Sequence, residues 1–320
     1  MDNQDKLLKA IRRKLSPQAS VIDEIALVLS ISYDAAHRRV SQKSKFSIEE
    51  AIALCRHYNL SMDMLFSDSN KVIVEKTAEI RSMADMEGYF KQGAENISSF
   101  LNYPNAKMYY SAKDIPLFYT IGGTLLSKFK LYVWLNLLAG TQNQQSFESF
   151  TVNQKLLEHS SKLKAVYDSV EVHEIWNDTT INSTLQQMYY FFQSGLLTLP
   201  NALLLGADLK RVLQTAEDRC CNGSSRFHMY YNELLILNNN VLLSAPQQRL
   251  LFVPYTMLGY FITNDVATCA NANDFFKHQV KNSKSLNESG TRDRKLFFNK
   301  GHQKIDFYLQ RMQTEVDPGF

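Results

Sequence analysis

The densest group of titratable side chains in the sequence is Glu171, His173 and Glu174, with Trp176 close behind. Carboxylates and an imidazole that line a cleft can act as general acid and general base. The more ordinary interpretation is the solvated end of a strand, and this is the one we favour. We therefore expect no enzyme activity.

Metal and cofactor chemistry find little support in the spacing of the remaining residues. The seven histidines are scattered singly, without an i, i+4 pair and without a cysteine at ligand spacing. Gly88 to Gly93 has the spacing of a phosphate-binding loop, but Ala94 and Glu95 follow where Lys and Ser or Thr are needed. We expect neither a metal nor a cofactor, and we expect the four cysteines to be reduced thiols.

The residues from Val21 to Gln42 carry a pattern that indicates a function. A helix-turn-helix needs a small residue where its helices touch, apolar residues around it, and a polar cap that opens the second helix. Ala26 is the small residue, Ser32 is the cap, and Ala36 and Val40 point inward. The outward side chains of the second helix can hydrogen-bond base edges or phosphates: Tyr33, Asp34, His37, Arg38 and Ser41.

Basic residues gather in two segments of a chain whose net charge is only +3. Lys6 to Lys14 contains five of them and no acid, and Ala35 to Ile48 contains four and no acid. A positive face on a small domain is what neutralisation of DNA phosphates requires. The expected phosphate contacts are Arg12, Arg13, Lys43 and Lys45, together with base readout by Tyr33, His37 and Arg38.

The run SVIDEIALVLSISYDAAHRRVSQKSKFSIEEAIALCRHYNLSMDMLF resembles the XRE-type, lambda-repressor-like helix-turn-helix regulators and covers about the first fifth of the chain. The resemblance implies that the second helix of the motif lies in the DNA major groove, opened by Ser32. The sequence departs from the family pattern at Ser30, where glycine is usual, and at Arg39, where a buried aliphatic residue is common. Which of Arg38 and Arg39 faces the groove stays open. The rest of the chain loosely resembles the long C-terminal regions of such regulators of Bacteroidetes type, which implies no ligand or chemistry.

Cap signals and apolar spacing predict that five helices form an all-α domain over residues 1–67. The expected helices are Leu7 to Leu15, Val21 to Leu29, Tyr33 to Val40, Ile48 to Tyr58 and Met62 to Phe66. Ser, Asp and Asn accumulate after them, so we expect a linker over residues 68–79.

Residues 80–320 are expected to form a larger, helix-rich α+β domain with a small antiparallel sheet. The expected strands are Ala106 to Ser111, Arg226 to Leu237, Val241 to Ser244 and Arg249 to Tyr255, with Asn238 to Asn240 as a hairpin turn. The expected helices are Leu125 to Leu138, Gln154 to Tyr167, Ile181 to Leu196, Ala202 to Glu217, Ala270 to Lys281 and Arg292 to Met312.

An apolar stripe with helical spacing runs from Ile80 to Leu101. It either packs within its own domain or, if it stays exposed in one chain, pairs with its copy in a homodimer. Tyrosines and phenylalanines are also abundant in this domain, among them Tyr110, Phe118 and Tyr260. Most should be core, but some can line a pocket for a small-molecule effector.

The N-terminus lacks the apolar stretch of a secretory signal, and the longest apolar window, Leu250 to Ile262, is too short to span a membrane. We therefore expect a cytoplasmic regulator of transcription that binds double-stranded DNA, as a homodimer. The alternative is a protein-interaction or scaffold module whose helix-turn-helix docks a protein partner. The two differ in salt dependence, which is steep for phosphate contacts and weak for an apolar docking surface.

Overall fold

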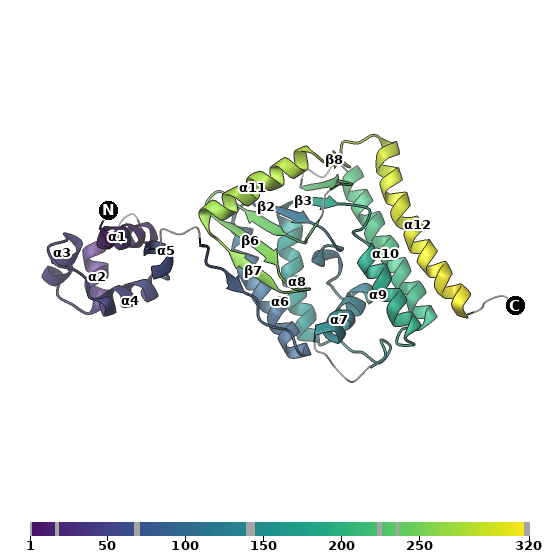
Figure 1. Ribbon diagram of the computed structural model, residues 1–320, viewed down its shortest axis with the longest axis horizontal. Coiled ribbons are helices and arrows are strands. Elements are labelled where there is room, and N and C mark those ends of the chain that lie inside the picture. The colour runs from purple at the N-terminus through teal and green to yellow at the C-terminus, as the bar shows by residue number, and fades with distance from the viewer. Residues whose placement is uncertain are drawn as a thin grey trace. The chain divides into compact units, whose positions relative to one another are not determined.

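The computed structural model describes residues 2–16, 19–66, 71–138, 145–222, 226–234 and 237–316 (Figure 1). It forms two compact units, Met1–Ile73 and Val74–Phe320. Within the linker expected at 68–79, Glu75 and Lys76 form a strand of the second unit, and 68–70 lie outside the described residues.

The first unit is built from helices with local start signals. Its helices are α1 (Asn3–Lys14), α2 (Val21–Leu29), α3 (Tyr33–Val40), α4 (Ile48–His57) and α5 (Met62–Phe66). Ser20, Ser32 and Ser47 each accept a hydrogen bond from the backbone N–H three residues later, which satisfies a donor that the first helical turn leaves open. The apolar faces meet in a small core of Leu7, Leu8, Ile11, Ile25, Ala36, Leu54 and Cys55.

The second unit contains an eight-stranded mixed sheet with the strand order β1-β7-β6-β5-β2-β3-β4-β8. The strands are β1 (Glu75–Lys76), β2 (Lys107–Ser111), β3 (Glu171–Trp176), β4 (Phe227–Tyr231), β5 (Val241–Ser244), β6 (Arg249–Pro254), β7 (Tyr260–Thr263) and β8 (Lys284–Ser285). Strands β2, β3 and β4 are parallel, and the other pairs are antiparallel.

Helices connect the parallel strands and cover the sheet. They are α6 (Met83–Ser98), α7 (Leu125–Leu138), α8 (Gln154–Ser169), α9 (Asn182–Gln193), α10 (Leu199–Cys221), α11 (Val266–Lys281) and α12 (Thr291–Val316), with short 3-10 turns η1 (Ser99–Asn102) and η2 (Leu117–Tyr119). The β2–β3 crossover contains α7 and α8, and the β3–β4 crossover contains α9 and α10, because parallel strands need long connections.

The expectation of a small antiparallel sheet is wrong, because the sheet has eight strands and β2, β3 and β4 pair in parallel. Strands β4 and β5 also do not form the expected hairpin. In the sheet they are separated by β2 and β3. Asn239 does adopt the left-handed conformation (φ 62°) that the sequence suggested. Its side-chain oxygen, however, accepts hydrogen bonds from the backbone N–H groups of Lys113 and Asp114, so this turn is fixed to the segment after β2. The strand expected to reach Leu237 ends at Tyr231, and residues 235–236 lie outside the described part.

The two faces of the sheet are covered unequally (Figure 1). One face joins the main core, to which α6 to α10 and α12 contribute. The other face packs Tyr109, Ile175, Leu242 and Leu251 against Cys269 and Phe276 of α11. Side chains at alternate positions of one strand therefore enter different environments.

The apolar stripe of α6 packs within its own unit. Phe90 and Ile97 are buried in the main core, and the helix lies against α8. The stripe therefore packs inside one chain, as the first of the two interpretations expected. Its buried part is not available to pair with a second copy of the chain.

Candidate nucleic-acid interface

The turn between α2 and α3 is held by backbone hydrogen bonds. Ser30 adopts the left-handed conformation (φ 53°) at the end of α2, where glycine is the usual residue. Its N–H and that of Ile31 donate to carbonyls of the last turn of α2, including that of Ala26. Ser32 then caps α3 through its hydroxyl, which accepts from the N–H of Ala35 at 3.3 Å. Serine therefore fulfils the role that glycine has in related turns.

Burial along α3 follows the predicted inward phase. Ala36 is fully buried, and Val40 packs against the core of the first unit. The side chains predicted to point outward are exposed: Tyr33, Asp34, His37, Arg38 and Ser41. The cap residue Ser32 is exposed as well. The rings of Tyr33 and His37 lie one helical turn apart and stack with their centroids at 6.4 Å. The exposed face of α3 is thus polar and aromatic.

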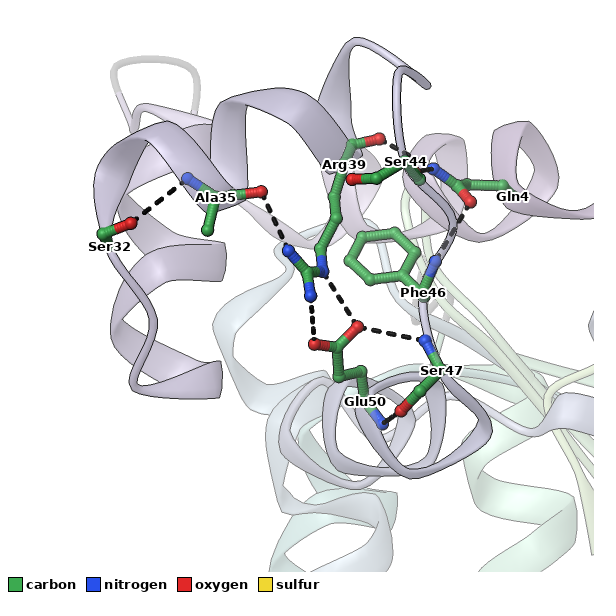
Figure 2. Close-up of polar contacts among 8 residues, drawn as sticks. All are labelled: Gln4, Ser32, Ala35, Arg39, Ser44, Phe46, Ser47 and Glu50. Carbon is green, nitrogen blue, oxygen red and sulfur yellow. Dashed lines mark hydrogen bonds and ion pairs between the residues drawn. The ribbon is translucent and has the colours of Figure 1, made fainter.

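The structure separates the roles of Arg38 and Arg39. Arg39 donates from Nε to Glu50 Oε2 at 2.9 Å and from Nη2 to Glu50 Oε1 at 2.7 Å, and its Nη1 donates to the carbonyl of Ala35 (Figure 2). The guanidinium lowers the pKa of the Glu50 carboxyl, and the carboxylate raises that of Arg39. Arg39 is therefore occupied in joining α3 to α4, whereas Arg38 is exposed to solvent.

The loop after α3 is fixed from α1 by a glutamine that sequence analysis did not single out. Gln4 is buried, and its Nε2 donates to the carbonyls of Arg39 (2.7 Å) and Ser44 (2.9 Å). Its Oε1 accepts from the N–H of Phe46 at 3.2 Å (Figure 2). The partners lie 35 to 42 positions away in sequence, so no local signal identifies them.

The predicted phosphate contacts fall into two places. Lys43 and Lys45 are exposed in the loop after α3, and Lys45 forms an ion pair with Asp2 beside the start of α1. Arg12 and Arg13 are exposed at the other end of α1. An α-helix rises 1.5 Å per residue, which places Arg12 about 12 Å along the helix from Gln4. The structure therefore groups the two lysines with α3 and sets the two arginines apart.

The group Glu171, His173 and Glu174 does not share one pocket. Glu174 is buried in the main core, where it accepts from Tyr167 Oη at 2.7 Å and Trp176 Nε1 at 2.9 Å. Tyr119 Oη also donates to it, at 3.2 Å. Burial raises the pKa of Glu174 despite these donors. Glu171 and His173 lie on the opposite face of β3, because side chains alternate along a strand.

On that face the sheet brings His228 of β4 beside His173. His173 Nε2 lies 2.9 Å and His228 Nε2 lies 3.5 Å from Glu171 Oε1, a set of ligand types that metals use. The imidazole rings stack at 4.6 Å, nearly parallel, so one ion cannot lie in both ring planes. Lys107 Nζ also contacts Glu171 Oε1 at 2.9 Å. As described, the arrangement is a polar cluster centred on Glu171, with an ion pair to Lys107 and a hydrogen bond to His173.

No helix in the described part of the chain is long and apolar enough to cross a membrane. Comparisons with protein-family models, with curated proteins and with solved structures found no match for this chain.

Proposed function

We propose that this protein is a cytoplasmic transcriptional regulator that reads double-stranded DNA with α3. The observation that supports this most directly is that the two faces of α3 differ. Ala36 and Arg39 hold the helix to its own unit, while Tyr33, His37 and Arg38 are left exposed on the helix that follows the turn. A recognition helix needs such a free polar face and a fixed inner face.

The exposed side chains have the chemistry of base readout. A guanidinium such as that of Arg38 can donate two hydrogen bonds to O6 and N7 of one guanine in the major groove. His37 and Tyr33 offer further polar groups within one helical turn, and Asp34 can accept from the amino group of cytosine. Lys43 and Lys45 follow in the adjoining loop, where phosphate contacts would set the position of the helix on the duplex.

A homodimer remains part of the proposal, because one small domain contacts few base pairs and symmetric regulators bind two half-sites a helical turn apart. The burial of the α6 stripe means that such a dimer would use another surface of the chain.

The test is a selection from random double-stranded DNA with the full-length chain, followed by binding titrations on the enriched sequence. Replacing Arg38 by Ala should weaken specific binding by about 1–3 kcal/mol and relax the preference at one base pair. Arg56→Ala is the matched control, since Arg56 is an exposed arginine of α4 that is not among the proposed contacts. Failure to enrich any sequence, or equal binding by all three proteins, would overturn the proposal.

Salt dependence distinguishes DNA binding from the protein-docking alternative. Affinity for the selected duplex should fall linearly on a plot of log K against log salt, with a slope of about −0.9 for each phosphate contacted. Lys43→Ala should make this slope shallower by about one contact without changing the preferred sequence. A protein partner held by an apolar surface would bind with an affinity that changes little with salt.

A further inference from the structure

The second unit contains a cavity of about 580 Å³ between α6 and the face of the sheet that belongs to the main core. Its walls include Met108 and Tyr110 of β2, Tyr260 of β7 and Phe118 of η2. Of the aromatic residues that suggested a pocket, Tyr110, Phe118 and Tyr260 therefore line one, whereas others such as Tyr132 and Phe191 are buried in the core away from it. Cavities that hold small organic ligands have volumes in this range.

Two glycines of α6, exposed Gly88 and half-buried Gly93, leave space at the wall of the cavity. A Cβ atom at Gly88 would meet nothing within 4 Å, and one at Gly93 would only touch Leu163 at 3.7 Å. Both glycines line the cavity. Each costs a helix about 0.5–1 kcal/mol relative to alanine, so the helix gives up stability here without any gain in close packing. Gly206 and Gly301 differ, because there a Cβ atom would collide with a leucine of the facing helix.

The interior favours an uncharged ligand. Tyr110 is buried, and burial raises its pKa well above the ordinary value and that of Tyr260 to about 12, so these hydroxyls stay neutral at physiological pH. The described wall has three charged side chains, of which Glu75 lies exposed to solvent on the edge strand and the other two already have partners. Lys76 pairs with Glu79, and Asp85 accepts hydrogen bonds at the start of α6. A charged ligand would lose its hydration without gaining a free counter-charge from these two side chains.

One wall of the cavity is the strand that leads into the second unit from the first. Glu75, Lys76 and Thr77 all line it. This segment pairs with β7 through two residues and through the N–H of Thr77, which donates to the carbonyl of Tyr260 at 3.0 Å. Strand β1 is a short, exposed edge strand, so few contacts hold it in place. A ligand that packs against this segment would add to those contacts.

We propose that the cavity binds an uncharged, largely apolar small molecule and that the bound molecule holds β1 onto β7. The segment 75–77 can extend the chain between the two units by about 10 Å when it is not paired, at about 3.3 Å per residue. Ligand binding would therefore change the reach of the first unit, and with it the affinity of a dimer for paired half-sites. This last step, unlike ligand binding itself, rests on the proposed function in DNA binding.

The cavity is tested with the neutral fluorescent probe N-phenyl-1-naphthylamine and the full-length chain. The wild type and the control Gly290→Ala, at an exposed glycine outside the cavity, should bind the probe in a saturable manner and with similar affinity. Gly88→Phe, which places a ring in the open space, should bind at least about tenfold more weakly, or about 1.4 kcal/mol. Circular dichroism checks that the variant is folded, and Gly93→Leu gives a second blocked cavity. Absence of saturable binding to the wild type, or unchanged binding to both blocked variants, would overturn the proposal.

The effect on β1 is measured by amide hydrogen exchange and so does not depend on DNA. The probe should slow exchange at Thr77 in the wild type and in Gly290→Ala, but not in Gly88→Phe. Unchanged exchange at Thr77 with the probe bound would overturn the proposal that the ligand holds β1 onto β7. It would not affect the proposal that the cavity binds a ligand. If the probe slows exchange at Thr77 but the chain enriches no DNA sequence, the proposed function in DNA binding is wrong. The proposal that a ligand holds β1 onto β7 is then still supported. Slowed exchange together with an unchanged DNA affinity would refute the regulatory step alone.

Discussion

Arg39 and Glu50 form a two-point hydrogen-bonded ion pair that joins α3 to the first turn of α4. Both side chains are about one-fifth exposed. Glu50 also accepts from the N–H of Ser47 and so belongs to the capping box of α4. One carboxylate thus fixes the orientation of α3 and the start of the next helix.

Replacing Arg39 by Ala should destabilise α3 and α4 by about 2 kcal/mol, because it removes hydrogen bonds between charged partners and leaves a half-buried carboxylate unpaired. Arg39→Lys should restore only part of the loss, since an ammonium cannot match both oxygens. Amide hydrogen exchange of the two helices in the full chain measures the change. Arg38→Ala is the control and should not change the exchange rates. Equal effects of the two alanine variants would contradict the conclusion that Arg39, and not Arg38, joins α3 to α4.

The same pair makes the first unit sensitive to acid. The pKa of Glu50 is lowered in the folded chain, so its contribution to stability is present above the ordinary pKa of a glutamate and is lost as pH falls through the lowered value. Exchange in α3 and α4 should therefore accelerate as pH falls below about 4.5, after correction for the intrinsic pH dependence of exchange. Glu50→Gln should show a smaller acid response, and an unchanged response would exclude this pair as its source.

Gln4 should be as important to the first unit as a core residue. Gln4→Met keeps the volume but removes three hydrogen bonds, which leaves the groups around Arg39, Ser44 and Phe46 without this partner. The expected loss is about 2–3 kcal/mol, measured by urea unfolding of the full chain. Asn3→Ala, at the exposed neighbouring position, should change stability by less than about 0.5 kcal/mol. A small effect of Gln4→Met would mean that water replaces the amide.

The helices of the first unit could be predicted from the sequence because their signals are local. Ser20, Ser32 and Ser47 each cap a helix by accepting a hydrogen bond from the N–H three residues later. The apolar spacing predicted where α2 and α3 begin and end. The outward set on α3 followed from the same spacing. The choice between Arg38 and Arg39 could not be predicted, since it depends on Glu50 in another helix.

The sheet was harder to predict because its pairing is not local. Strand β3 lies between β2 and β4, which are far from it in sequence, and the glutamates and histidine of β3 mask its alternation. Glu174 is buried and its neighbour His173 faces the other way, so a group that looked like one acid–base cluster belongs to two environments. The cavity could not be predicted either, because it depends on how α6 and β1 lie against the sheet.

Glu174 should make the second unit less stable as pH rises. Its pKa is raised in the folded chain, so its favourable contribution is complete below the ordinary pKa and is lost as pH rises through the raised value. Urea unfolding between about pH 5 and pH 8 should show this decline in the wild type, and Glu174→Gln should remove it. Glu174→Leu should cost about 3 kcal/mol or more, because Tyr119, Tyr167 and Trp176 lose their acceptor. A pH response that survives in Glu174→Gln must come from another group.

Two glycine-to-alanine replacements should have opposite effects on the second unit. A Cβ atom at Gly206 of α10 would lie 2.5 Å from Leu309 Cδ1 of α12, so Gly206→Ala displaces the half-buried Leu309 side chain and should cost about 1 kcal/mol. Gly88→Ala meets no neighbour within 4 Å and should stabilise α6 by about 0.5–1 kcal/mol through helix propensity alone. The stability changes of the two variants are compared from their urea unfolding midpoints, provided that the m-value is unchanged. Leu309→Ala in the Gly206→Ala chain should recover part of the loss, because it removes the atoms that collide; without recovery, close packing of α10 on α12 is not the cause.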